Sequence, residues 1–213
     1  MSQPAGAFSL FATLRQEAVR SPQAPREGGG LADVQLVALA REDRGAALEA
    51  MYAAYKGRIY TFLLRFLADA ELADDITQET FTKAYGALGS LTGGHRVLPW
   101  LYRIATNAAL DHLRRRRRFA WLRMGAIANT ADEPSMPDEH GRVPEREHIQ
   151  AVLRGLPPEN SIALLLHAVE GYSYAEIAEI QGVTMTAVRS RIARARASFR
   201  RAYGDGSGSE PPA

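Results

Sequence analysis

GVTMTAVRSRIARARASFRRAYG, residues Gly182 to Gly204, holds six arginines and no acidic residue, yet apolar residues keep returning among them. Val188, Ile192, Ala195 and Phe199 stand at i, i+4, i+7 and i+11, so they form one stripe along a helix. A helix with this pattern packs through the stripe and presents cationic side chains on its other faces.

The residues before this helix have the arrangement of a helix-turn-helix. Ala178 supplies a small residue where two helices cross, Gly182 supplies the turn, and Val188 anchors the second helix. Ser173 stands three residues before Glu176, which predicts a capping box at the start of the first of the two helices.

A cationic second helix of this kind has the dimensions that enter a DNA major groove. We expect Arg189, Ser190 and Arg194, near its start, to reach base edges, while the other arginines contact phosphate. The alternative is a solvated basic face, or one that binds an acidic protein.

The rest of the chain predicts more helices and no strand, because apolar residues from Leu31 to about Arg123 recur at helical spacing. We expect an all-α protein of two small helical domains joined by a flexible linker, with the helix-turn-helix in the C-terminal domain. The linker is predicted from prolines and acidic residues with almost no large apolar residue. The predicted divisions are a disordered or weakly ordered extension at 1–30, an N-terminal domain at 31–124, the linker at 125–144, the C-terminal domain at 145–203 and a disordered tail at 204–213.

Composition narrows the function classes. The 26 basic and 24 acidic residues of this 213-residue chain nearly cancel, so only their placement is informative. The absence of cysteine excludes disulfides and cysteine-ligated metals. No apolar run has the length of a membrane span, and the N-terminus lacks a signal-peptide pattern. We therefore expect a cytoplasmic protein without membrane insertion.

The segment from Ala70 to Leu88 predicts a helix with a buried face and a polar face. Its acidic-polar face is expected to hold Glu71, Asp75, Gln78 and Thr82. Its opposite face is expected to hold Ala73, Ile76, Thr80, Phe81, Ala84 and Leu88. Paired carboxylates can bind metals, but acids in a first helical turn are commonly partners of the helix dipole. We therefore predict no metal site, no cofactor and no catalytic residue.

The helix expected at Arg96 to Arg118 has a packing stripe and a separate polar side. The stripe is predicted to comprise Leu101, Ile104, Ala105, Ala108 and His112. Trp100, Arg103 and Asn107 lie off it. The run Arg114 to Arg118 is typical of a solvated helix end, but beside aromatic residues it also suits single-stranded DNA.

Three segments in this order resemble the extracytoplasmic-function group of bacterial sigma factors, the compact members of the sigma-70 family. AELADDITQETFTKAY resembles the polymerase-binding helix of region two, and PWLYRIATNAALDHLRRRRR resembles its promoter-melting helix. LPPENSIALLLHAVEGYSYAEIAEIQGVTMTAVRSRIARAR resembles region four. The resemblance spans about Asp33 to Tyr203.

The resemblance implies an RNA polymerase sigma factor, with partners in core RNA polymerase and promoter DNA. Asp75, Gln78 and Glu79 match positions that contact the polymerase clamp helices. Trp100, Arg103 and Asn107 match positions that separate strands at the minus-ten element, and the loop 90–96 matches the one that captures an extruded base. Arg189, Ser190 and Arg194 match positions at the minus-thirty-five element. An inhibitory anti-sigma factor is common in the family, but no residue here establishes one.

The sequence also departs from the family pattern. Asn160 and Ser161 stand where an arginine is usual, and Ala193 stands where a larger side chain is common, so a relative's promoter sequence does not transfer. The rival interpretations are a dimeric helix-turn-helix regulator, a decoy that absorbs an inhibitory partner, and a metal-dependent nuclease using Asp75 or Glu79.

Overall fold

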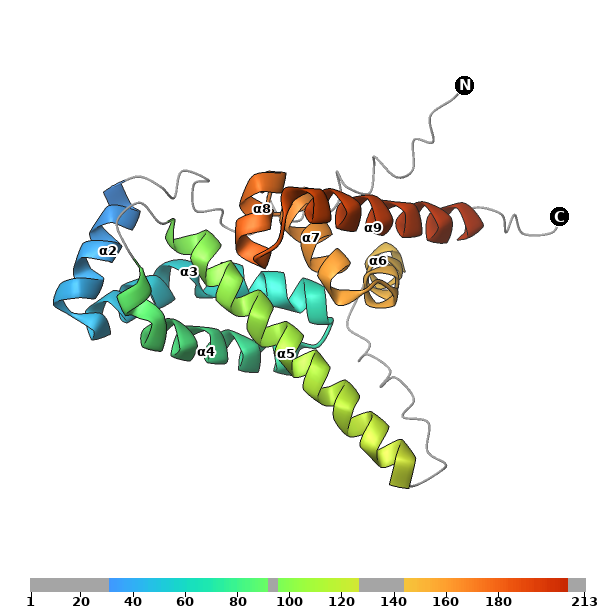
Figure 1. Ribbon diagram of the computed structural model, residues 1–213, viewed down its shortest axis with the longest axis horizontal. Coiled ribbons are helices and arrows are strands. Elements are labelled where there is room, and N and C mark those ends of the chain that lie inside the picture. The colour runs from blue at the N-terminus through green and yellow to red at the C-terminus, as the bar shows by residue number, and fades with distance from the viewer. Residues whose placement is uncertain (1–30, 92–95, 127–143, 207–213) are drawn as a thin grey trace.

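The computed structural model describes residues 31–91, 96–126 and 144–206, and within these ranges every regular element is helical. Figure 1 shows how the elements are arranged. The elements are α2 (Leu31–Glu42), α3 (Arg44–Leu67), α4 (Ala70–Ala87), the short 3-10 helix η1 (Leu88–Ser90), α5 (Val97–Ala126), α6 (Pro144–Gly155), α7 (Pro158–Ala168), α8 (Tyr174–Gln181) and α9 (Met185–Gly206). The all-α expectation is confirmed.

In the N-terminal module, α2 to α5, helices α3 and α4 begin after residues whose side chains satisfy free backbone N–H groups. The Asp43 carboxylate accepts hydrogen bonds from the N–H groups of Gly45 and Ala46, and Asp69 accepts one from Leu72. Such caps stabilise a helix start by about 1 kcal/mol each. They fix where α3 and α4 begin, and so the register of the apolar faces that pack together.

A buried carboxylate joins three helices of this module. Asp33 of α2 is almost fully covered, and it accepts a hydrogen bond from the Tyr55 hydroxyl of α3 at 3.1 Å and one from the Val97 N–H of α5 at 3.2 Å. Burial, together with the neighbouring Asp33, raises the pKa of Tyr55 to about 12, so this phenol keeps its proton as a donor. Asp33 therefore holds the first turn of α5 in place.

The C-terminal module consists of α6 to α9. The predicted capping box is confirmed, because Ser173 accepts from the Glu176 N–H while the Glu176 carboxylate accepts from the Ser173 N–H. Helix α8 ends at Gly182 with a φ of 64°, and the Val183 N–H reaches the Ala178 carbonyl at 3.0 Å. Glycine adopts this left-handed conformation without steric cost, so Gly182 fixes the turn into α9.

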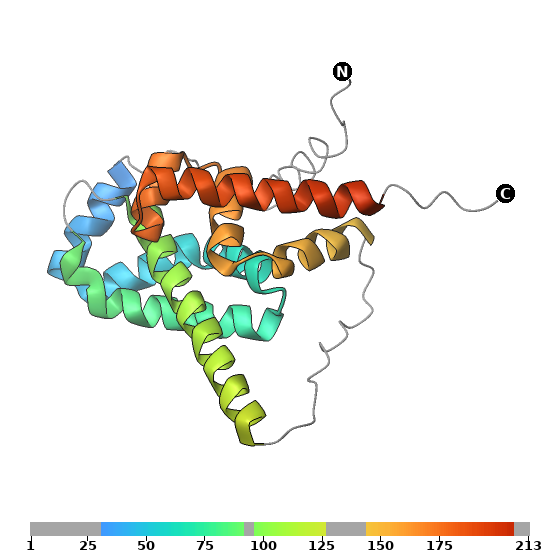
Figure 2. The same cartoon turned by 45° about the vertical axis from the view of Figure 1, so that its right-hand side comes forward.

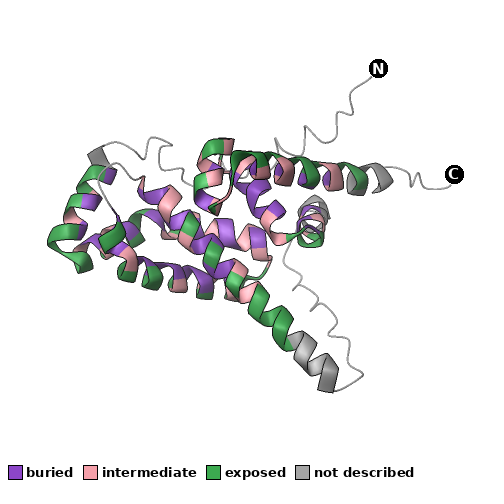
Figure 3. Cartoon of the chain, viewed as in Figure 1, coloured by how far each residue is buried: buried purple, intermediate pink, exposed green. Residues whose placement is uncertain are grey.

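The two modules pack against each other. Helix α5 contacts α8, and α3 contacts α6 and α7. In both Figure 1 and Figure 2, α8 lies beside the N-terminal part of α5. Buried apolar residues of both modules form one continuous cluster, coloured purple in Figure 3.

Several boundaries differ from the predicted ones. The structure has a helix, α6, from Pro144, where the linker was predicted to end, and its Leu153 carbonyl accepts a hydrogen bond from the buried Ser161. Helix α5 runs two residues past 124, and α9 continues to Gly206, so the first three residues of the predicted tail are helical. The extension 1–30, most of the linker and the last seven residues lie outside the described residues.

Replacing glycine by alanine should have opposite effects on the free energy of unfolding at two positions. Gly182→Ala should lower the free energy of unfolding by about 1–2 kcal/mol, because alanine strains the left-handed conformation although its Cβ would meet no atom within 4 Å. Gly57→Ala, in the exposed middle of α3 and equally unobstructed, should raise it by about 0.5–1 kcal/mol through helix propensity. Urea unfolding followed by circular dichroism measures both, and two shifts of the same sign would contradict the assignment.

Candidate protein and nucleic-acid interfaces

The apolar stripe predicted on the helix that starts after Gly182 is buried in the structure. Val188, Ile192, Ala195 and Phe199 of α9 are all at most 3% exposed. Arg189 and Arg194 are exposed, while Ser190 is half-buried. Helix α9 therefore packs through one face and presents guanidinium groups on another, as its spacing predicts.

A side-chain relay that the sequence did not indicate fixes this helix against the two before it. Arg191 of α9 donates to the side-chain oxygen of Gln181 at 2.7 Å, and the Gln181 amide donates to the backbone oxygen of Glu159 at 3.1 Å. The relay joins α9, α8 and α7, so the arginine face is held on a rigid support. Arg191 is thus a structural arginine among arginines that face solvent.

Helix α4 has the two faces that its sequence predicts. Glu71, Asp75, Gln78 and Thr82 are exposed, and the six residues expected on the opposite face are all buried. Gln78 donates to Asp74 at 2.7 Å, which gives this surface an ordered edge. An exposed acidic and polar strip suits a basic partner surface.

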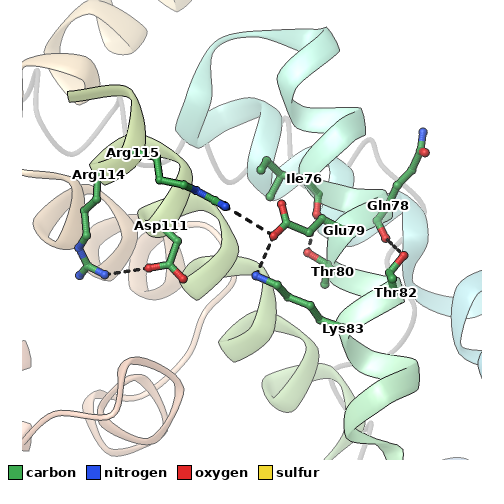
Figure 4. A network of polar contacts seen from close by, with 9 residues as sticks. All are labelled: Ile76, Gln78, Glu79, Thr80, Thr82, Lys83, Asp111, Arg114 and Arg115. Carbon is green, nitrogen blue, oxygen red and sulfur yellow. Dashed lines mark hydrogen bonds and ion pairs between the residues drawn. The ribbon is translucent and has the colours of Figure 1, made fainter. Parts of the chain in front are cut away.

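Glu79 differs from its two neighbours in the predicted interface. It is partly covered and lies 2.7 Å from the Lys83 ammonium and 3.9 Å from the guanidinium of Arg115 on α5 (Figure 4). Its carboxylate therefore joins α4 to α5. Asp75 and Gln78 form the outward part of the predicted interface, with Glu79 at its inner border.

Trp100, Arg103 and Asn107 lie at i, i+3 and i+7 on α5, so they share one side of the helix. Arg103 and Asn107 are exposed, whereas Trp100 is half-buried and packs on the apolar cluster. The structure thus presents an aromatic ring, held in place by the apolar cluster, beside two polar side chains. Of the expected base-capture loop, residues 92–95 lie outside the described part of the chain.

The other side of α5 is also buried, which sequence periodicity missed. Tyr102 is fully covered, with its ring edge-on to Phe62 of α3 and to Tyr172 of the C-terminal module at centroid distances of 5.0 and 5.6 Å. Thr106 and Ala109 are buried as well. The signal in the sequence is an aromatic residue off the predicted stripe, followed by small residues at i+4 and i+7.

Beyond its buried half, α5 extends away from the rest of the molecule (Figures 1 and 2). The arginines from Arg114 to Arg118 on this part are exposed, and Figure 3 shows the segment in green. Four of them, with Lys83 and Asp111, line an open depression between α4 and α5. The helix therefore carries a concentrated positive charge beyond Asn107.

Two further features are absent from the described residues. No group of three or more histidine or acidic side chains is placed to hold a metal ion there. Nor does any helix in that part of the chain have the length and apolar character needed to cross a membrane.

Comparisons with known proteins agree with this arrangement. Residues 51–119 match the family model of sigma-70 region 2, and residues 146–199 match that of sigma-70 region 4. The RNA polymerase sigma-H factor of Pseudomonas aeruginosa is 34% identical over 80% of this chain and 93% of its own length. The sigma factor CarQ of Myxococcus xanthus is 32% identical over 78% of this chain and 94% of its own.

Solved structures show the same fold. The sigma factor RpoE of Bartonella quintana, in complex with the anti-sigma factor NepR, matches 73% of this chain and 96% of its own with a TM-score of 0.59 and 22% identity. CnrH, in complex with the cytosolic domain of CnrY, matches 84% of this chain and 99% of its own with a TM-score of 0.60 and 24% identity. From the two family models and the relatives that match over nearly their whole length, the chain belongs to the sigma-70 family, in its extracytoplasmic-function group.

Proposed function

We propose that this protein is an RNA polymerase sigma factor that binds core polymerase through α4, separates promoter strands at the minus-ten element through α5 and reads the minus-thirty-five element through α9. The observation that carries the proposal is that one chain presents three exposed surfaces of matched chemistry on the family's fold. It acts by binding and positioning, without catalysing a reaction itself. An anti-sigma partner stays a prediction.

The polymerase contact is assigned to the acidic-polar face of α4. Asp75 and Gln78 are exposed and the opposite face of the helix is buried, so both side chains are available without local unfolding. Electrostatic complementarity of such a face with a basic partner raises the association rate and fixes orientation. Glu79 contributes at the border of this face and keeps its ion pair with Arg115.

Strand separation is assigned to the side of α5 with Trp100, Arg103 and Asn107. Unstacking a nucleobase costs a few kcal/mol. An aromatic side chain that is held rigidly offsets part of that cost by stacking on the nucleobase. Trp100 is held in this way because it packs on the apolar cluster. The arginine run further along α5 supplies positive charge for the phosphates of the opened strand.

Duplex reading is assigned to the exposed face of α9. Arg189 and Arg194 point away from the buried stripe, and the Arg191–Gln181 relay limits how far the helix can tilt. Phosphate contacts supply affinity and base contacts supply specificity, so a rigid helix lets a few side chains discriminate between bases.

Run-off transcription with bacterial core RNA polymerase on a promoter library tests the whole proposal. The protein should direct initiation from a subset of promoters, and Trp100→Ala should lower this activity about tenfold or more on duplex templates, a barrier change of about 1.4 kcal/mol. Trp100→Phe, which keeps the packing and a stacking ring, should retain most of it. A template mismatched across the minus-ten element should restore part of the loss. Absence of sigma-dependent initiation on every promoter would refute the proposal.

Core binding should depend on the outer face of α4. Asp75→Ala combined with Gln78→Ala should weaken association with core polymerase about tenfold, because two polar contacts of about 0.5–1.5 kcal/mol each are lost. Glu49→Ala, which removes an exposed acid from α3, is the matched control and should bind normally. Fluorescence anisotropy of labelled protein measures both, and equal affinities of the two variants would remove α4 from the interface.

Recognition by α9 should show in the salt dependence of promoter binding by the holoenzyme. If an arginine contacts phosphate, its replacement lowers the slope of log K against log salt by about 0.9. If it contacts a base, the slope changes little and discrimination at one base pair falls by about 1–3 kcal/mol. Arg189→Ala and Arg194→Ala should each show one of these effects, whereas Arg154→Ala, which removes an exposed arginine from α6, should show neither.

A further inference from the structure

One large apolar side chain at the start of α9 faces solvent. Met185 is 50% exposed, and among residues 149–201 it is the only large apolar residue with an exposed side chain. Single exposed apolar residues are common on protein surfaces, so the exposure alone indicates no function. The position of Met185 is informative, because it lies one helical turn before Arg189, which is assigned to duplex reading.

The start of α9 is formed without the Met185 side chain. The Thr184 hydroxyl accepts a hydrogen bond from the Ala187 N–H at 3.2 Å. Val183 packs on the apolar cluster and Val188 is fully buried, whereas Met185 is not among the residues that pack on this cluster. These neighbours supply the cap and the apolar anchors that a helix start needs. No contact among the described residues therefore accounts for a methionine at this position.

Met185 shares one side of α9 with Arg189 and Ala193. The three residues stand four apart, and all are exposed. Ala193 offers only a methyl group, so Met185 is the long apolar side chain of this surface. Four residues of helix rise about 6 Å, which corresponds to about two base pairs at about 3.4 Å each. Residues near the start of a recognition helix are the ones that reach base edges, so Met185 is placed to reach a base about two pairs from Arg189.

The major groove offers such a side chain one apolar group, the C5-methyl group of a pyrimidine. Thymine carries this group, and 5-methylcytosine carries it at the same position of the ring. A thioether side chain is flexible and polarizable, so it can cover a methyl group without a fixed partner geometry. Burying one methyl group changes affinity about fourfold.

We propose that Met185 is a specificity-determining residue of the duplex-reading surface, and that it selects a pyrimidine carrying a C5-methyl group. The proposal rests on the duplex-reading role proposed for α9. It adds an apolar contact that the arginines do not make, because a guanidinium group recognises hydrogen-bond acceptors. A promoter read in this way distinguishes thymine from uracil, and 5-methylcytosine from cytosine.

Promoter duplexes that lack single methyl groups test the contact. In the minus-thirty-five element of a promoter bound by the holoenzyme, each thymine is replaced in turn by uracil, which removes the methyl group and keeps the hydrogen-bonding edge. Binding by the parent protein should weaken about fourfold at one position. Met185→Ala should bind the thymine and uracil duplexes equally there, and Met185→Leu should restore most of the difference. Val34→Ala, which truncates an exposed apolar residue of α2, is the matched control and should keep the full difference.

Cytosine methylation tests the second source of the same group. With a cytosine at the responsive position, its C5-methylation should strengthen binding by the parent about fourfold and leave Met185→Ala unaffected. A response to uracil without a response to cytosine methylation would support the contact with thymine as its source. A methyl effect that persists in Met185→Ala would arise from DNA shape and would overturn the contact. Equal parent binding to the thymine duplex and every uracil duplex would overturn it as well.

The full-length protein without polymerase separates this proposal from the function it rests on. Duplexes that the protein retains from a random library are compared in thymine and uracil forms, with the parent and with Met185→Ala. Methyl-dependent binding by the chain alone, without sigma-dependent initiation, would uphold the Met185 contact and refute the sigma function. Initiation without any methyl effect would uphold the sigma function and refute the contact. Absence of duplex binding by both the free chain and the holoenzyme would refute both.

Discussion

The contact between the two modules depends on one carboxylate that is almost completely shielded from water. Removing a charge from water costs several kcal/mol, and the cost is offset only where opposite charges and hydrogen bonds replace the lost hydration. Glu170 meets that condition with two guanidinium groups and a phenol. Those three partners all lie on the other module, so Glu170 joins the two modules.

Tyr102 explains how this polar contact coexists with a continuous apolar cluster. Its ring packs edge-on between Phe62 and Tyr172, while its hydroxyl reaches the Glu170 carboxylate. An aromatic body with a polar tip can be fully buried without leaving a donor unsatisfied. Helix α5 consequently has two buried sides along its first half, and the remaining side carries the residues assigned to strand separation. The helix is rigid there because it is held by both modules.

Local features of this structure could be predicted from the sequence, because their causes lie within one or two helical turns. The apolar stripe of α9, the two faces of α4, the Ser173–Glu176 capping box and the left-handed Gly182 all follow from spacing and backbone preference. Features that join distant segments could not be predicted. Nothing in the sequence near Glu170 indicates Arg58 or Arg65, which lie more than 100 residues away. Likewise, nothing in the sequence distinguishes Arg191 from the other arginines of α9, and only the structure shows its hydrogen bond to Gln181.

The candidate site residues also divide into those whose placement follows from local sequence and those whose placement depends on distant contacts. Exposure of Asp75, Gln78, Arg103 and Arg194 follows from helical periodicity, whereas the pairing of Glu79 with Arg115 depends on how α4 and α5 cross. The family's arginine near the double proline is replaced here by Asn160 and Ser161, both buried. The hydrogen bond from Ser161 to the Leu153 carbonyl connects α7 to α6. That departure is therefore absorbed by packing within the module.

Glu176 takes part both in a contact within its own helix and in a contact between the two modules. Burial alone would raise the pKa of its carboxyl, but hydrogen bonds from the Ser173 N–H and hydroxyl, together with Arg96, hold that pKa below its ordinary value. Its stabilising contribution is therefore fully present above the unfolded pKa of about 4.3 and is lost as pH falls through the lower folded value. One side chain caps α8 from within and pairs with Arg96 across the module contact. Glu176 therefore fixes the start of α8 and, through the short turn at Gly182, contributes to the placement of α9.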